Sequence, residues 1–275
     1  MKKLLYSLLS VIVCFMALGQ KVSAVENRIV LSPGNFSILI PDGECEQVRL
    51  AAEALSRDFG KVTGFSPSLT SSSADGVSAE VVVVNEATEG SEGLLAVKKD
   101  LDGFESHRVF ADASANRIYL YGKDMRGTIY AIYSFSEQVL GVPPLWYWCD
   151  WQPEKKSEIT VEGDFDYFCS SPQVRYRAWF PNDEDLFIPW RRKSTGNNEM
   201  WLETMLRLKL NTVEYTATVT TGGTLNAEAM LYKKYGLVLT SHHMVALNNS
   251  FANWDAYWRD VRHTAVPALS VNDMK

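Results

Sequence analysis

The sequence predicts an α/β fold in two parts: an N-terminal α/β unit, then the opening strand–helix units of an incomplete (β/α)₈ barrel. Three short apolar runs in the second half alternate with amphipathic helical stretches, which is the pattern of a parallel sheet. Two of these runs lead directly into polar residues that can do chemistry. Polar groups at the carboxyl ends of successive parallel strands are typical of barrel enzymes.

Residues 1–24 read as a signal peptide rather than as part of the fold. Lys2 and Lys3 form a basic start, an apolar stretch follows over 4–18, and Val22-Ser-Ala24 offers the small residues that signal peptidase requires. A membrane anchor is the alternative, but the apolar stretch is shorter than the roughly 20 residues of a membrane span. We therefore expect export to the periplasm or the extracellular space, with a mature chain beginning at Val25.

The amino-acid composition of the chain indicates which classes of binding partner are disfavoured. The 275 residues carry 33 acidic and 27 basic side chains, a net charge of −6, which does not favour nucleic acid or anionic membranes as partners. Beyond Cys14 of the leader only Cys45, Cys149 and Cys169 remain, too few and too irregular for a disulfide framework or a metal motif. We expect buried or free thiols, no cofactor and no metal, and the sequence does not predict the oligomeric state.

Residues 25–165 read as an accessory α/β domain that should fold by itself. The expected order is strand, helix, strand, hairpin, helix and a last short strand, with the helices on one face of the sheet. The strands are expected at 36–40, 80–84, 107–111, 117–122 and 157–161, the helices at about 45–62, closed by Gly64, and 125–140, and an exposed loop at 66–78.

An aromatic segment, Leu145-Trp-Tyr-Trp-Cys-Asp-Trp151, precedes the barrel region. Two interpretations stay open. The rings could form a hydrophobic seam between the two parts, or one ring, such as Trp148, could project into a sugar site.

The barrel region is expected over 170–262, with 263–275 unassigned. Strands are predicted at 178–180, 212–219 and 237–240. Helices are predicted at 199–210, 227–235 and from 253 onward, capped by Asn198, Asn226 and Asn253 in turn, the second closed by Gly236. A closed barrel needs eight such units and three can be counted, so the active site is expected to be incomplete in this chain.

Several segments together resemble glycoside hydrolase family 115, the secreted α-glucuronidases that remove glucuronic acid from xylan and related plant glycans. They keep their order and spacing from about residue 30 to 260 and are Gly122-Lys-Asp-Met-Arg-Gly-Thr-Ile-Tyr-Ala-Ile-Tyr133, Trp146-Tyr-Trp148, Lys156-Ser-Glu-Ile159, Val174-Arg-Tyr-Arg177, Asn182-Asp-Glu184, Met205-Leu-Arg-Leu-Lys-Leu-Asn211 and Thr240-Ser-His-His243. The resemblance implies an α/β accessory domain, a (β/α)₈ catalytic barrel and hydrolysis with inversion. The segments after Asn211 and His243 depart from the family's usual pattern, which leaves the sugar undefined.

The first predicted strand ends in Asn182, Asp183 and Glu184. Glycoside hydrolysis uses two carboxyl groups, which in an inverting enzyme stand roughly 6.5–9.5 Å apart. Adjacent residues on an extended chain point to opposite sides, so Asp183 and Glu184 cannot both form that pair. The resemblance implies that the main acid and base lie beyond this chain. One of the two carboxylates is therefore expected to contact sugar, and the alternative is a capping or loop carboxylate.

His242 and His243 follow the third predicted strand and could donate hydrogen bonds to sugar hydroxyls or to a glucuronate carboxylate. A metal site is disfavoured, because neighbouring histidines point to opposite faces and no third ligand is close in sequence. The basic run at 191–193 could steer an acidic polysaccharide or could simply be a solvated face. Arg126 is expected to be an internal ion-pair partner.

The sequence thus predicts a secreted glycoside hydrolase of the α-glucuronidase type. Asp183 and Glu184 are its candidate catalytic residues, and Asn182, His242, His243 and Trp148 are its candidate substrate contacts. The alternative is a non-catalytic fragment whose accessory domain contacts a glycan or a protein.

Overall fold

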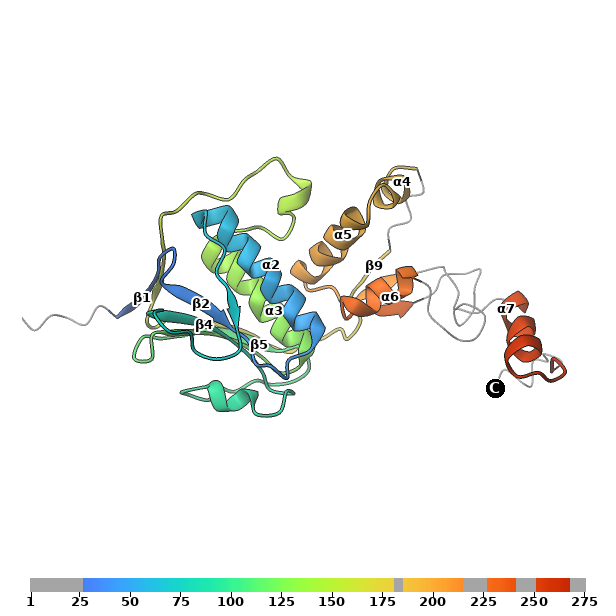
Figure 1. The fold of residues 1–275 in the computed structure, drawn as a ribbon, viewed down its shortest axis with the longest axis horizontal. Coiled ribbons are helices and arrows are strands. Elements are labelled where there is room, and N and C mark those ends of the chain that lie inside the picture. Colours follow the sequence, from blue (N-terminus) through green and yellow to red (C-terminus); the bar gives the residue numbers. More distant parts are fainter. Residues whose placement is uncertain (1–26, 181–184, 215–226, 241–250, 268–275) are drawn as a thin grey trace, which may run out of the picture.

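The structure, a computed structural model, describes residues 27–180, 185–214, 227–240 and 251–267. It is a mixed α/β protein in which helices and sheets alternate along the chain (Figure 1). Over the part of the chain that is described, no helix combines the length and the apolar character of a membrane span.

The N-terminal region is built on a six-stranded sheet in the order β3-β2-β4-β6-β5-β8. The sheet is parallel from β3 to β6 and antiparallel from β6 to β8. All seven residues of β4 are buried, as expected for an unbroken β-branched run at the centre of a sheet. The strands are β2 (Phe36–Leu39), β3 (Leu69–Thr70), β4 (Ala79–Asn85), β5 (His107–Asp112), β6 (Arg117–Gly122) and β8 (Asp166–Cys169).

Two long helices, α2 (Glu46–Thr63) and α3 (Met125–Phe135), cover one face of this sheet (Figure 1). α2 ends at Gly64, whose φ of +77° suits a residue without a Cβ atom. α3 begins at Asp124, whose side chain accepts a hydrogen bond from the amide of Gly127, and it continues into a π-helical turn over Ser136–Leu140. The opposite face of the sheet packs against apolar side chains of the segment that includes the short helix at Ser91–Leu94.

The second region contains a three-stranded parallel sheet in the order β11-β10-β9. Its strands are β9 (Ala178–Trp179), β10 (Thr212–Glu214) and β11 (Val238–Thr240), with α4 (Phe187–Arg192) and α5 (Thr195–Arg207) after β9 and α6 (Ala227–Lys234) after β10. The predicted alternation of strand and helix is therefore present. α7 (Phe251–Ala256) and a π-helical turn (Tyr257–Val261) lie away from the body of the protein in Figure 1.

One hydrophobic core runs through both regions. Trp201, Leu202 and Met205 of α5 are fully buried in the same cluster as residues of α2, α3 and the inner strands. α5 therefore lies on the helical layer of the N-terminal region. The two regions therefore have separate sheets on either side of residue 170 but share one hydrophobic core.

Several element boundaries differ from the sequence predictions. The predicted loop at 66–78 contains the short strand β3, and the predicted last strand (found as β7, Ile159–Glu162) pairs with β1 (Arg28–Leu31) in a separate two-stranded sheet. β8 and α4 were not predicted. β8 alternates exposed and half-buried residues at the sheet edge, and α4 has only six residues, so both carry a weak periodic signal.

Two predicted helix caps are wrong. α5 begins at Thr195 with Ser194 as its cap, because the Ser194 hydroxyl accepts the amide hydrogen of Asn197, so Asn198 lies in the first turn. α7 begins at Phe251, so Asn253 lies inside that helix. Asn226 lies outside the described residues. The predicted closure at Gly236 is confirmed by its φ of +72°.

Candidate functional site

The parallel strands β9, β10 and β11 bring three carboxyl ends to one edge of their sheet. Val213 of β10 is paired with Trp179 of β9 and with Leu239 of β11, so the strands are aligned without a large stagger. Segment 181–184 begins two residues after β9, and segment 241–243 follows β11 directly. The strands from which the predicted polar residues follow are therefore neighbours on either side of β10.

Five of the six predicted site residues, Asn182, Asp183, Glu184, His242 and His243, lie outside the described residues. Their roles stay predictions. The described strands establish only that the segments carrying them follow two strands that flank the same central strand.

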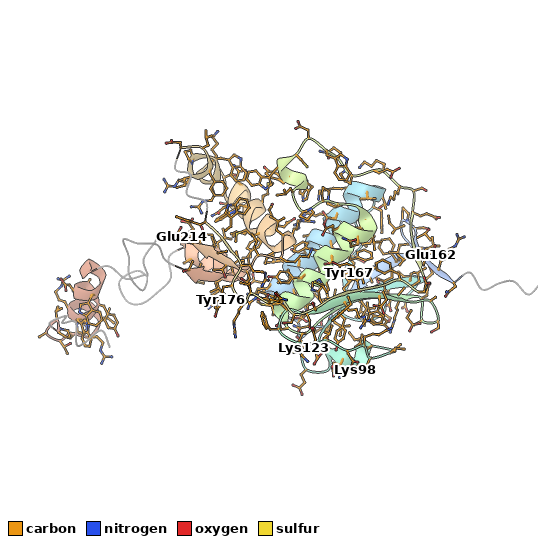
Figure 2. All side chains as sticks on the ribbon, turned by 180° about the vertical axis from the view of Figure 1, so that it is seen from behind. Lys98, Lys123, Glu162, Tyr167, Tyr176 and Glu214 are labelled. Carbon is orange, nitrogen blue, oxygen red and sulfur yellow. The ribbon has the colours of Figure 1, made fainter. Side chains whose placement is uncertain are left out.

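Sequence reasoning missed a carboxylate at this edge. Glu214 closes the described part of β10, in register with Thr240 of β11, and Figure 2 labels it. The expected strand ran over 212–219 and included Glu214, which was not singled out as a candidate. The available signal was its place on the strand between the two strands that lead into the predicted polar residues.

A cluster of aromatic rings lies between α4, α5 and the segment Trp146–Trp148. Trp148 lies with its ring centroid 4.7 Å from that of Trp190 and 6.4 Å from that of Phe187. Phe187 in turn contacts Trp179 at the end of β9 and Trp201 of α5, at 6.4 and 5.1 Å. The rings therefore connect the carboxyl end of β9 to the interior of the protein.

Trp148 is the one predicted site residue that the structure describes. Its indole N–H donates to the hydroxyl of Thr204 on α5 at 3.1 Å, while the side chain stays 40% exposed. The hydrogen bond and ring contacts match the seam interpretation, because they join the aromatic segment to α4 and α5. The exposed part of the ring is compatible with a sugar contact, which stays a prediction.

The basic run at 191–193 divides into a paired residue and two exposed residues. Arg191 forms an ion pair with Glu228 of α6 at 2.6 Å and donates to the Tyr232 hydroxyl at 2.5 Å. Arg192 and Lys193 are exposed. Arg191 thus joins α4 to α6 and is part of the scaffold.

A buried carboxylate holds the opposite, amino-terminal ends of β9 and β10. Glu105, which is 2% exposed, pairs with Arg126 and Arg177, each at 2.5 Å, and accepts a hydrogen bond from the Asn211 amide at 2.9 Å. Arg177 directly precedes β9 and Asn211 directly precedes β10. The prediction that Arg126 is an internal ion-pair partner is confirmed.

The backbone around this carboxylate is constrained. Glu105 has a φ of +57°, an uncommon conformation for a residue with a side chain, and its amide donates to the Asp124 carboxylate at 2.9 Å. The nearby Tyr130 is buried, and this burial raises the pKa of its hydroxyl above the ordinary value. Glu105, Arg126, Arg177 and Asn211, here called the Glu105 clamp, join the N-terminal region to the first two strands of the second sheet.

The match to a known protein family covers the second region of the chain. The model of glycosyl hydrolase family 115 matches residues 169–268, which include β9, β10 and β11. The predicted resemblance to family 115 is confirmed. No curated protein sequence matches the chain.

Solved structures extend the likeness to most of the chain. A family 115 4-O-methyl-α-glucuronidase with specificity for decorated arabinogalactans superposes with a TM-score of 0.68 at 22% identity, over 90% of this chain and 39% of that one. An N-acetyl-β-hexosaminidase of Streptomyces plicatus gives a TM-score of 0.51 at 12% identity, over 88% of this chain and 48% of that one. At these identities the likeness concerns the fold. The chain spans less than half the length of either structure.

Proposed function

We propose that this chain forms the N-terminal part of a glycoside hydrolase of the α-glucuronidase type, which removes glucuronic acid side chains from xylan-like plant polysaccharide. The observation that carries the proposal is the family 115 match over residues 169–268, the region of the three parallel strands. The 4-O-methyl-α-glucuronidase that shares the fold over 90% of the chain supports the same reaction class.

In this proposal β9, β10 and β11 are the first three strands of a (β/α)₈ catalytic barrel, and residues 25–165 are its α/β accessory domain. The parallel order and the helices between the strands support the assignment. Barrel enzymes bind substrate at the carboxyl ends of their strands, so Asp183 or Glu184 after β9 and His242 or His243 after β11 would face the sugar. Glu214 on the central strand joins them as a candidate carboxylate.

Activity provides the direct test. The longest polypeptide that the gene encodes should release glucuronic acid from glucuronoxylan, and Asp183→Ala should lower kcat/KM at least about tenfold, a loss of about 1.4 kcal/mol in transition-state stabilisation. The melting temperature should stay nearly unchanged. Wild-type-like turnover in the variant would remove Asp183 from the site, and no release of glucuronic acid by the wild type would overturn the proposed function.

The proposal includes export, since the polymeric substrate is extracellular. Mass spectrometry of the protein recovered from the periplasm of a Gram-negative host should find Val25 at the N-terminus, after removal of residues 1–24. Recovery of the intact leader in the membrane fraction would instead indicate an anchor.

A non-catalytic role in glycan contact is the second candidate. It is favoured by the exposed indole rings of Trp148 and Trp151, which are 40% and 53% exposed. Sugar rings stack on such surfaces, so binding to glucuronoxylan without any release of glucuronic acid would select this role.

A further inference from the structure

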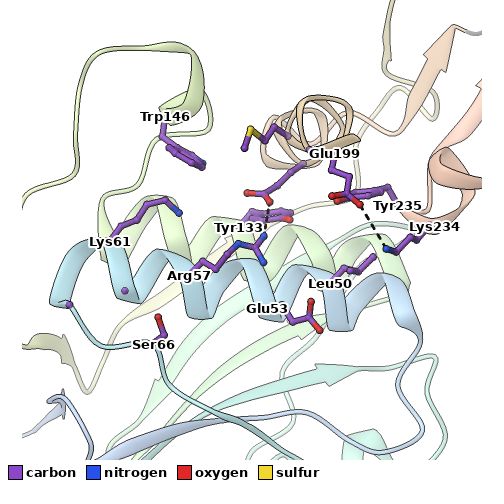
Figure 3. Close-up of a pocket in the computed structure, with 15 residues that line it drawn as sticks. Leu50, Glu53, Arg57, Lys61, Ser66, Tyr133, Trp146, Glu199, Lys234 and Tyr235 are labelled. Atoms are coloured by element: carbon purple, nitrogen blue, oxygen red, sulfur yellow. Dashed lines mark hydrogen bonds and ion pairs between the residues drawn. The ribbon is translucent and has the colours of Figure 1, made fainter. Parts of the chain in front are cut away.

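A cleft of about 850 Å³ lies between the helical layer of the N-terminal region and helices α5 and α6 (Figure 3). Its walls come from α2 and α3 on one side and from α5 and the end of α6 on the other. Ligand-binding clefts in proteins have volumes of about 300–1,000 Å³, so this one is large enough for a small oligomer.

Aromatic rings stand at the two ends of the cleft, as Figure 3 shows for Trp146 and Tyr235. The ammonium group of Lys61 lies 4.1 Å from the centroid of the Trp146 ring. Trp146 contacts Tyr147, with ring centroids 5.5 Å apart, and Tyr147 contacts Trp148 in the aromatic cluster near the end of β9. A series of ring contacts therefore leads from the Trp146 end of the cleft to Trp179 at the end of β9.

The charges between these rings are balanced. Arg57 pairs with Glu203 at 2.9 Å, and Lys234 approaches Glu199 at 4.0 Å. With Lys61 and Glu53 the lining has three basic and three acidic side chains. A polyanion or a phosphate group gains nothing from a lining without net charge, whereas a hydroxyl-rich neutral ligand can donate to the carboxylates and accept from the guanidinium and ammonium groups.

We propose that this cleft binds a stretch of neutral, β-linked polysaccharide backbone. Such a chain presents flat sugar faces to aromatic rings and hydroxyl groups along its edges, which matches rings at the ends of the cleft and mixed charged groups between them. The site involves none of the residues proposed for hydrolysis. A peptide fits less well, because an extended backbone needs a strand edge or an apolar groove with pockets.

The cleft would hold the polymer on the same molecule as the proposed reaction site. Binding through a second contact raises the effective concentration of the substrate, and it does so without taking part in the chemistry. The proposal is independent of turnover, because binding to the cleft does not require hydrolysis.

Isothermal titration calorimetry with xylohexaose on the 275-residue chain tests the site. Wild-type protein should bind the hexasaccharide, while Trp146→Ala and Tyr235→Ala should each weaken binding at least about tenfold through loss of an aromatic contact. Arg57→Ala, whose side chain is 56% exposed and can be removed without opening the core, should weaken it several-fold. Tyr176→Ala is the matched control, because this ring is 57% exposed and lies outside the cleft, and it should bind like the wild type.

The outcomes separate the alternatives. Absence of binding by the wild-type protein overturns the proposal. If the single variants Tyr235→Ala and Arg57→Ala both bind as tightly as the wild type, the proposal is also overturned, even if Trp146→Ala fails to fold. Tighter binding of maltohexaose than of xylohexaose contradicts the β-linked backbone, and loss of binding only in Trp148→Ala assigns the sugar to the aromatic cluster instead. A protein that binds xylohexaose through the cleft but releases no glucuronic acid would retain this proposal and lose the proposed function.

Discussion

The six-stranded sheet of the N-terminal region and the three-stranded sheet of the second region differ in how they are stabilised. β4 has seven residues, all buried, whereas the described parts of β9, β10 and β11 have two or three residues each, of which only Thr212 and Val213 are buried. The larger sheet has its own helical layer, α2 and α3. The smaller one is attached to that layer through α5, whose buried face shares the N-terminal core.

The difference indicates that the second region depends on the first for its position. Two buried polar groups join them in addition to the apolar contacts. One is the Glu105 clamp at the start of β9 and β10, and the other is the ion pair between Asp58 of α2 and Arg207 of α5 at 2.6 Å. Removing one partner of a buried ion pair leaves an uncompensated charge and lowers the stability of the fold. Substitutions in either group therefore measure how strongly the second region depends on the first.

The largest effect is expected from Asp58→Ala. Asp58 is fully buried and contacts Arg207, Lys61 and the Ser136 hydroxyl, and Arg207 is 2% exposed. Burial alone would lower the pKa of Arg207, but the carboxylates of Asp58 and Glu203 outweigh it and raise the pKa above its ordinary value. Removing Asp58 leaves the buried guanidinium with Glu203 as its one remaining ion-pair partner, so unfolding in urea should show a loss of about 3 kcal/mol or more.

The control is the double variant Asp58→Leu with Arg207→Met, which removes both charges and keeps apolar volume. It should recover much of the lost stability, because neither charge is then buried without a partner. A single variant that loses less than about 1 kcal/mol would show that the two regions are not held together through this pair.

Much of the fold was predictable because its signals are local. The unbroken valine run of β4, the helical spacing of Val48, Ala51, Ala52, Leu55 and Phe59 in α2, and Gly236 after α6 each follow from chain periodicity or backbone conformation. The pairing of β1 with β7 joins residues about 130 positions apart, and no local pattern specifies it. The choice of Ser194 over Asn198 as a cap also depended on where α4 ends.

The site was less predictable for a physical reason. Strand ends decide which side chains face a barrel opening, and the two-residue strand β9 gives almost no periodicity from which to locate an end. The Glu105 clamp was missed because its members come from four separate segments, although Arg126 alone was correctly interpreted as an ion-pair partner.

An intermediate effect is expected from Glu105→Gln. The amide keeps the size of the side chain but removes the negative charge shared by Arg126 and Arg177. Hydrogen bonds to charged groups contribute about 1.5–3 kcal/mol, so chemical denaturation should show a loss of about 2 to 3 kcal/mol. Hydrogen exchange should increase at the amides of β9 and β10 more than at those of β4, because the clamp holds the start of the second sheet. Uniform exchange across both sheets would show that Glu105 does not act on the second sheet in particular.

The smallest predicted effect is a pH dependence within the N-terminal region. His107 on β5 is 1% exposed, and its ring nitrogens face the Glu105 carbonyl oxygen and the Ser134 hydroxyl. The pKa of His107 is lowered from the ordinary value of 6.5 to about 4, chiefly by burial and also by the Lys209 charge, while the hydrogen bond and the charge of Glu105 oppose the change. As the pH falls from 6.5 toward 4, the unfolded chain takes up a proton before the folded one does, so stability decreases with falling pH.

Between pH 7 and pH 5 the protonation of His107 in the unfolded chain should lower the free energy of unfolding by about 2 kcal/mol. The measurement is the difference between wild type and His107→Gln in unfolding free energy at the two pH values, which cancels the contribution of the other titrating groups. The variant should be less stable at pH 7, because the ring packs against Tyr130 and Tyr167. It should lose less stability on acidification. Equal losses in the two proteins would mean that His107 titrates alike in the folded and unfolded chains, and that the buried face between β5 and α3 admits water.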